Sequence, residues 1–257
     1  MRISFIGAGR VATHLAKAFS THHEIVDICS RSLESSSRLA RLVGAQACAQ
    51  AYDMRGDIDL LVIAVSDQAI AKVIGDVAKF FEDVLIVHTS GSTNIQVLTQ
   101  AHQRSGVFYP LQTFSLEREI DWLSTPLLIE TAVKEDQKIL VHLAESISKN
   151  VYSYNSEQRL SLHLAAVFAC NFSNYCYDMA HQIVDAQSVD FSLLHPLILE
   201  TAHKATQYAP HTVQTGPAVR GDQNIIQMHT HMLEEANRMD LSAIYECMSV
   251  GILKRKQ

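Results

Sequence analysis

The chain lacks the excess of basic residues that a nucleic-acid-binding protein needs. Among its 257 residues, 21 Lys and Arg stand against 27 Asp and Glu, which gives a formal net charge of -6. Binding to a phosphate backbone requires clustered positive charge, and the only basic cluster here is the short run at residues 254–256. The composition therefore excludes nucleic acid as the expected partner.

Paired cysteines and long apolar runs are also missing. No two cysteines have the Cys-x-x-Cys spacing of a zinc or redox site; they are Cys29, Cys48, Cys170, Cys176 and Cys247. The longest apolar run near mid-chain, residues 60–65, is far shorter than the ~20 residues of a membrane-spanning helix. Residues 1–7 have the pattern of a strand and a glycine turn, which differs from a signal peptide. These features predict reduced thiols, no membrane insertion and a cytoplasmic location.

The first part of the chain alternates between strand and helix patterns. Apolar, β-branched runs predict strands over residues 2–6, 24–29, 58–65, 84–88, 107–109 and 127–130. Amphipathic patterns predict helices over residues 11–19, 33–43 and 69–80. The run at residues 60–65 is continuously apolar, as is typical of a parallel strand that is buried on both faces. This alternation predicts an α/β domain with a doubly wound, Rossmann-like parallel sheet.

After about residue 155 the pattern is helical only. Residues 157–186 contain neither Gly nor Pro, and further helices are expected over residues 191–208, 224–238 and 241–253. Turn-forming Pro and Gly residues interrupt the helices over residues 209–222. We therefore expect a dinucleotide-binding domain over residues 1–153, followed by an all-α domain over residues 154–257.

A glycine turn joins the first strand to the first helix. Its sequence is GAGRVA, in which Gly7 permits a tight turn and Gly9 lets the backbone approach a pyrophosphate closely. Ala12 occupies the third position and still allows the helix to pack closely on the strand. The backbone of Arg10 and Val11 would then present free N–H groups and the positive end of the helix dipole to the phosphates. A turn without a ligand is the alternative, but the strand-turn-helix context favours a dinucleotide.

The end of the second strand indicates which dinucleotide is bound. An NAD site places an acidic residue there, whereas this chain has Ser30, Arg31 and Ser32. A guanidinium between two hydroxyls suits a 2′-phosphate, because Arg forms charge-assisted bonds with phosphate oxygens. Asp27 lies before the strand end and should point away from the ribose. The pattern favours NADP over NAD, with a solvated loop position for Arg31 as the alternative.

Small polar residues follow other strands, at the edge of the sheet where ligands bind. We expect the segments after the third and fourth strands to contact the cofactor, through Val65, Ser66, His88 and Ser90. Ser66 is explained equally well as a helix N-cap. A further segment brings a phenol and an amide to the same edge, and we predict that Tyr109 and Gln112 bind the substrate.

Two polar residues on the long apolar helix are candidates for catalysis. His163 and Asn171 are eight residues apart and lie broadly on one side of the helix. Either both are satisfied polar groups of the core, or His163 donates a proton and Asn171 orients the substrate. Spacing alone favours the first alternative.

The segment at residues 215–222 combines turn residues with charge. Thr215 and Arg220 could bind an anionic substrate group with Asp222 fixing the guanidinium, or Arg220 and Asp222 could hold a loop to a helix. His229 and His231 are two residues apart on a helix and therefore lie on different faces. We predict no metal site.

Taken together, these segments resemble a known family. The matching motifs are GAGRVA (residues 7–12), HTSGS (88–92), YPLQTF (109–114), HLAAVFACN (163–171) and TGPAVRGD (215–222). They are similar to predicted NADP oxidoreductases with a Rossmann-like N-terminal domain and an all-helical C-terminal domain of unknown function. The Rossmann half resembles deazaflavin-dependent NADP oxidoreductases and pyrroline-5-carboxylate reductases. The chain departs from related proteins at Tyr109, where a His is common, and at Val167, where related hydroxyacid dehydrogenases have a catalytic Lys.

The resemblance implies a nicotinamide cofactor in the first domain, a cleft between the domains, and a homodimer formed through the helical domain. We expect an NADP-dependent oxidoreductase that transfers hydride between the nicotinamide and a small, anionic C=O or C=N substrate in that cleft. The alternative is a non-catalytic NADP-binding sensor or scaffold, since the matching Lys is absent at Val167.

Overall fold

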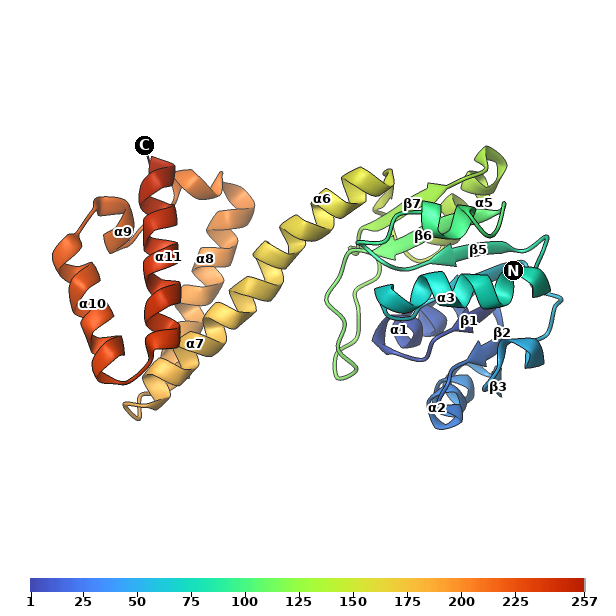
Figure 1. The fold of residues 1–257 in the computed structure, drawn as a ribbon, viewed down its shortest axis with the longest axis horizontal. Helices are drawn as coiled ribbons and strands as arrows, with labels where there is room; N and C mark the ends of the chain where they lie inside the picture. Colours follow the sequence, from blue (N-terminus) through green and yellow to red (C-terminus); the bar gives the residue numbers. More distant parts are fainter. Residues whose placement is uncertain (257) are drawn as a thin grey trace. The chain divides into compact units, whose positions relative to one another are not determined.

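The computed structural model describes residues 1–256, which form two compact units (Figure 1). The first unit spans Met1–Cys170, and the second begins at Asn171. The boundary expected from the sequence, after residue 153, coincides with the end of the last strand. The compact units divide farther along, because the first helix after that strand has its polar contacts within the first unit. Among the described residues, no helix is long and apolar enough to cross a membrane.

The first unit is built on one eight-stranded sheet. Its strand order is β3-β2-β1-β4-β5-β6-β7-β8. All neighbouring strands pair in parallel except β6 and β7, which are antiparallel. The strands are β1 (Arg2–Ile6), β2 (Glu24–Cys29), β3 (Gln46–Cys48), β4 (Leu60–Ile63), β5 (Leu85–His88), β6 (Ser105–Pro110), β7 (Leu127–Thr131) and β8 (Val151–Ser153).

Helices cover both faces of this sheet. Phe5 of β1 belongs to an apolar cluster with residues of α1, α2 and α5, whereas its neighbour Ile6 belongs to a second cluster with residues of α3 and α4. Successive strand residues thus face opposite layers, which confirms the predicted doubly wound fold. The helices of the first unit are α1 (Arg10–Phe19), α2 (Leu33–Val43), α3 (Asp67–Val77), α4 (Gln96–Thr99), α5 (Lys134–Glu145) and α6 (Ser156–Ala166).

The helix predicted over residues 157–186 is continuous but not uniform. It begins with α6, where Asn155 and Gln158 form a reciprocal capping box (Asn155 Oδ1 accepts from the Gln158 N–H at 2.9 Å). A π-helical segment follows at Val167–Phe172, and α7 (Ser173–Asp185) continues from it. A π-helical turn of this kind is often found at functional sites.

The second unit is helical throughout its described regular elements, as predicted for the C-terminal domain. After α7 it contains α8 (His195–Gln207), α9 (Pro217–Arg220), α10 (Gln223–Glu235) and α11 (Met239–Lys256). α9 is a single short helix within the interruption predicted over residues 209–222. No residue of α8 or α10 is buried.

Four helices and strands of the first unit were not predicted from the sequence, among them α4, which has only four residues. β3 and β8 are edge strands of three residues each, too short for a clear alternation of apolar and polar residues. α5 was missed because its first turn is strongly charged, although Leu140 and Leu143 pack in the core.

Candidate active site

A large cavity lies at the carboxyl ends of the parallel strands. Its volume is about 1050 Å³, and residues that follow β1, β2, β4 and β5 line it, together with residues of α3 and α6. This is the edge at which doubly wound sheets bind their ligands. Ten of the predicted site residues are in the lining: Gly7, Gly9, Arg10, Val11, Ser30, Arg31, Val65, Ser66, Ser90 and His163.

The glycine turn lines this cavity. Gly7 has φ +116°, and a Cβ there would lie 2.0 Å from the carbonyl oxygen of Ala64, so only glycine fits. At Gly9, by contrast, a Cβ would meet no atom within 4 Å, which leaves open space beside the backbone. Gly9 is also the N-cap of α1 and provides no side-chain cap, so the first N–H groups of the helix are free for an anion.

The end of β2 contributes positive charge. Ser30 and Arg31 line the cavity, and among residues 1–256 Arg31 forms no ion pair. Ser32 instead caps α2, where its side chain accepts a hydrogen bond from the Ser35 N–H at 3.2 Å. Asp27 is fully buried and forms an ion pair with Arg55 (3.2 Å). Its carboxylate is therefore occupied away from the cavity, as its position in the strand suggested.

The loops after β4 and β5 are joined to each other. Ser66 is the N-cap residue of α3 but makes no side-chain cap bond, so its hydroxyl is not committed to the helix. The Ser92 hydroxyl donates to the carboxylate of Asp67 at 2.5 Å. The Ser90 hydroxyl accepts hydrogen bonds from the Ser92 and Thr93 N–H groups at 3.2 and 2.9 Å. These bonds fold residues 89–93 into a tight loop over the end of β5.

His88 lies beneath this loop and does not line the cavity. Its ring is fully buried, and Nδ1 accepts a hydrogen bond from the Ser90 N–H at 3.1 Å. Burial, reinforced by the positive charge of Arg159, lowers the pKa of His88 to about 3. His88 is therefore neutral at physiological pH, and it contacts the loop at Ser90 rather than the cavity surface.

Tyr109 and His163 form a hydrogen-bonded pair, of which His163 lines the cavity and Tyr109 does not. The Tyr109 hydroxyl and His163 Nδ1 are 3.1 Å apart, and the two rings meet edge to face. Gly91 of the loop packs directly against both: a Cβ there would lie 2.6 Å from His163 Nδ1 and 2.7 Å from Tyr109 Cζ. Burial and the nearby charge of Asp67 raise the pKa of Tyr109 to about 12. The phenol consequently stays protonated at neutral pH.

The remaining predicted residues are not in this cavity. Gln112 lies in the loop between β6 and β7, where its side-chain oxygen accepts from the Thr113 N–H at 2.8 Å, and it lines a separate cavity of about 360 Å³. Asn171 is exposed at the start of the second unit. Thr215 and Arg220 also belong to the second unit, and the exposed Arg220 guanidinium is 4.0 Å from the Asp222 carboxylate.

Sequence reasoning missed several lining residues. Gln50, Lys72 and Asp76 line the cavity. Asp67 and Gly91 also line it, and both lie in the segments after strands that the sequence places at this edge of the sheet. Lys72 lies on α3 at a position that looks like an ordinary solvated helix residue, and Gln50 follows the unpredicted strand β3.

Comparison with known proteins identifies the family. Residues 2–91 match the family described as NADP oxidoreductase coenzyme F420-dependent, and residues 125–252 match a domain of unknown function, DUF2520. The chain is also similar to the solved structure of a candidate NADP oxidoreductase from Bacteroides fragilis. The two are 39% identical over 98% of each chain, with a TM-score of 0.92. The chain therefore belongs to the same family of NADP oxidoreductases as the Bacteroides fragilis protein. Membership confirms the predicted resemblance, the enzyme class and NADP as the cofactor.

More distant solved structures share the fold of this NADP oxidoreductase. An imine reductase from Myxococcus stipitatus in complex with NADP⁺ is 17% identical (99% of this chain and 93% of that chain, TM-score 0.73). A 1-pyrroline-5-carboxylate reductase from Streptococcus pyogenes is 16% identical (100% and 98%, TM-score 0.66). Among curated proteins, none matches the chain.

Proposed function

We propose that this NADP oxidoreductase transfers hydride between the nicotinamide and a small C=O or C=N substrate at the Tyr109–His163 end of the cavity. The observation that carries the proposal is that one cavity is lined by the glycine turn, by Arg31 and by His163. Nucleotide-binding features and a proton-bearing group thus face the same space. When bound, NADP supplies the hydride chemistry, and the protein supplies position and a proton.

The nucleotide would be held mainly by backbone N–H groups and by two cations. The open space beside Gly9 and the uncapped start of α1 fit a pyrophosphate. Arg31 and Ser30 fit the 2′-phosphate, since the guanidinium has no competing carboxylate among the described residues. Lys72 of the same lining adds a second positive charge.

The proton would come from the Tyr109–His163 pair. When hydride reaches the carbon of a C=O or C=N group, the oxygen or nitrogen must take up a proton. A Tyr109 hydroxyl that donates to Nδ1 leaves the proton of a neutral His163 ring on Nε2. His163 is therefore proposed as the general acid: Nε2 passes its proton to the substrate while Nδ1 takes up the proton of the Tyr109 hydroxyl, so the ring stays neutral and the phenol becomes a phenolate. Gln112, Asn171, Thr215 and Arg220 stay candidates for substrate binding, with Arg220 suited to an anionic group.

A nucleotide titration tests the cofactor side of the proposal. Purified protein is titrated with NADPH and with NADH, and bound nucleotide is followed by its fluorescence. NADPH should bind at least tenfold more tightly, and Arg31→Ala should remove that preference. Arg38→Ala is the matched control, since Arg38 is exposed on α2 but absent from the lining. Equal affinity for the two nucleotides in the wild type would refute the role of Arg31.

Variants of the pair test the proton-donor side. His163→Asn and Tyr109→Phe should bind NADPH within about twofold of the wild type. With a carbonyl or imine substrate found by screening, their turnover should fall by about 10²–10⁴ for His163→Asn and by less for Tyr109→Phe. Wild-type turnover in His163→Asn would exclude this residue as the acid.

We further propose that the helical unit forms a homodimer. α8 is rich in apolar residues, yet none of them is buried, and Leu197 and Leu199 are among the most exposed. An apolar surface of this kind is typical of the interface between two copies of a chain. Light scattering should give the mass of a dimer for the wild type and of a monomer for Leu197→Glu. Leu42→Glu is the matched control, since Leu42 and Leu197 are both 62% exposed and Leu42 lies on α2.

A further inference from the structure

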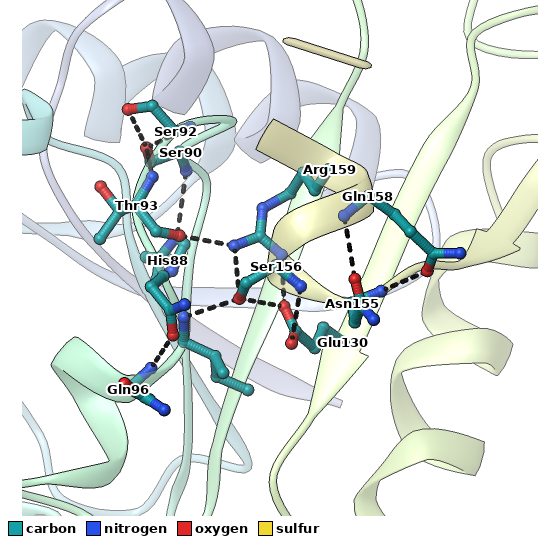
Figure 2. A network of polar contacts seen from close by, with 12 residues as sticks. His88, Ser90, Ser92, Thr93, Gln96, Glu130, Asn155, Ser156, Gln158 and Arg159 are labelled. Atoms are coloured by element: carbon teal, nitrogen blue, oxygen red, sulfur yellow. Dashed lines mark hydrogen bonds and ion pairs between the residues drawn. The ribbon is translucent and has the colours of Figure 1, made fainter. Parts of the chain in front are cut away.

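The first helix after the sheet is tied to it by one buried arginine. Arg159 of α6 is 1% exposed, and its guanidinium forms an ion pair with the Glu130 carboxylate of β7. A second nitrogen of the same guanidinium donates to the carbonyl oxygen of Thr93 at 2.5 Å. Figure 2 shows these bonds reaching from α6 to two separate parts of the sheet unit. A planar guanidinium can make both contacts at once because its N–H groups point in different directions.

Ser156 completes this network. Its N–H and hydroxyl both donate to Glu130, at 3.0 and 2.8 Å. The same hydroxyl accepts from the Ile95 N–H at 3.0 Å and from Arg159 at 3.1 Å (Figure 2). The start of α6 therefore holds the segment after β5 at two points, the carbonyl of Thr93 and the amide of Ile95.

The register of the sheet explains why these groups meet. His88 of β5 is level with Val107 of β6, which is level with Glu130 of β7. Residues level with one another in neighbouring strands point to the same face, so His88 and Glu130 share a face with one residue between them. Arg159 interacts with both, since its charge contributes to the low pKa of His88.

The segment held by Arg159 is the one against which the proposed proton donor packs. Gly91 lies two residues before Thr93, and its Cα approaches His163 and Tyr109 so closely that no side chain fits. His163 itself is one helical turn after Arg159 on the same side of α6. A shift of either α6 or residues 89–93 would consequently change the Tyr109–His163 hydrogen bond.

We infer that Arg159, through its ion pair with Glu130 and its bond to Thr93, is a positioning residue for the Tyr109–His163 pair. Arg159 itself does not line the cavity. It fixes α6 and residues 89–93 relative to each other, and the pair depends on both. The inference rests on the proposed function only in assigning catalysis to that pair.

The test compares Arg159→Lys with a matched control, Arg104→Lys. Arg104 also pairs with a buried carboxylate, Asp136 (2.5 Å), and also donates to a main-chain carbonyl, that of Asp83 (2.5 Å), but it is absent from the cavity lining. Two quantities are measured by NMR. One is the hydrogen exchange rate of the amides between residues 92 and 95, and the other is the ¹⁵N chemical shift of His163 Nδ1. Tyr109→Phe supplies the reference shift for a His163 ring without its hydrogen-bond partner at Nδ1.

Arg159→Lys should accelerate exchange at Ser92, Thr93 and Ile95 by at least tenfold and leave the amides of β1 and β4 unchanged. The Nδ1 shift should move toward the Tyr109→Phe value, whereas Arg104→Lys should leave both quantities as in the wild type. Uniform acceleration over the whole sheet, or an unmoved Nδ1 shift, would overturn the inference. Neither readout needs nucleotide or substrate, so a failure of the proposed function would be recognised separately.

A second variant distinguishes the loss of the ion pair from misfolding of the protein. Arg159→Met combined with Glu130→Leu removes both charges, a change that buried ion pairs often tolerate. This double variant should fold, show the same local acceleration, and show the same displaced Nδ1 shift. A folded double variant with the wild-type Nδ1 shift would refute a positioning role for Arg159.

Discussion

The two units of the chain bury their apolar side chains to very different extents. The sheet unit has two apolar clusters, one on each face of the sheet, whose central residues are fully buried. From residue 171 onward, the described buried apolar residues are only Met179, Ala218 and Leu241. The helical unit is nevertheless rich in Leu, Met and Tyr, many of them exposed. A sheet covered on both faces completes its own core, whereas this set of helices leaves much of its apolar surface exposed.

The strongest test within the sheet unit compares two glycines of the same turn. Gly7→Ala should destabilise the protein by about 3 kcal/mol or more, because the new Cβ would collide with the Ala64 carbonyl and φ is positive. Gly9→Ala should change stability by less than about 1 kcal/mol, since its Cβ meets no atom. Denaturant unfolding measures both. NADPH binding should still be lost in the folded Gly9→Ala variant, because the open space would be filled.

A second pair of variants compares the two units directly. Leu61 is fully buried in β4, and Leu61→Ala should cost about 3 kcal/mol at any protein concentration. Leu197→Ala should change the monomer by about 0.5 kcal/mol or less. If the helical unit dimerises, its effect should appear as a midpoint of unfolding that depends on protein concentration. A concentration-independent loss of several kcal/mol at Leu197 would mean that the helical unit has a core of its own.

Acid should weaken the sheet unit through His88. Its pKa is about 3 in the folded protein and about 6.5 when unfolded, so the unfolded chain binds the extra proton between these values. Stability is therefore retained above pH 6.5 and lost as the pH falls below it. Between pH 7.5 and pH 5, the His88 contribution should be about 2 kcal/mol. Urea unfolding at both pH values should give a smaller difference for His88→Asn, which keeps an acceptor for the Ser90 N–H.

The smallest expected effect distinguishes neighbouring serines after β2. Ser32→Ala should cost about 1 kcal/mol of stability through loss of the α2 cap, and NADPH affinity should stay within twofold. Ser30→Ala should do the reverse, since Ser30 lines the cavity and caps no helix. If NADPH affinity fell more in Ser32→Ala than in Ser30→Ala, Ser32 rather than Ser30 would be the residue that contacts the nucleotide.

The parts of the site that the sequence predicted are those formed by residues close to one another in the sequence. The glycine turn lies within six residues, and the positions of Ser30, Arg31 and Ser66 follow from the ends of clear strands. Local patterns of this length reflect turn geometry and strand period, which act over a few residues. The sequence also predicted His88 as a cofactor contact, but it did not reveal that the His88 ring is fully buried beneath residues 89–93.

The parts that the sequence did not reveal depend on distant contacts. Arg159 meets Thr93 across 66 residues and Glu130 across 29, and Tyr109 meets His163 across 54. Nothing in the neighbourhood of Arg159 distinguishes it from an exposed helix residue. The position of Arg159 follows only from the folded sheet, in which His88, Val107 and Glu130 are paired across three neighbouring strands.

The ion pair between Arg159 and Glu130 also has a consequence for the order of assembly during synthesis. Domains form as the chain emerges from its N-terminus, and the central strands β1 and β4 are complete after residue 63. The sheet then extends on one side through β5, β6, β7 and β8, in the order in which they are synthesised. The bond from α6 back to Thr93 can close only when residue 159 has been added. Within the sheet unit, the residues of the glycine turn are thus synthesised first, and the Tyr109–His163 pair is complete only near the end of that unit.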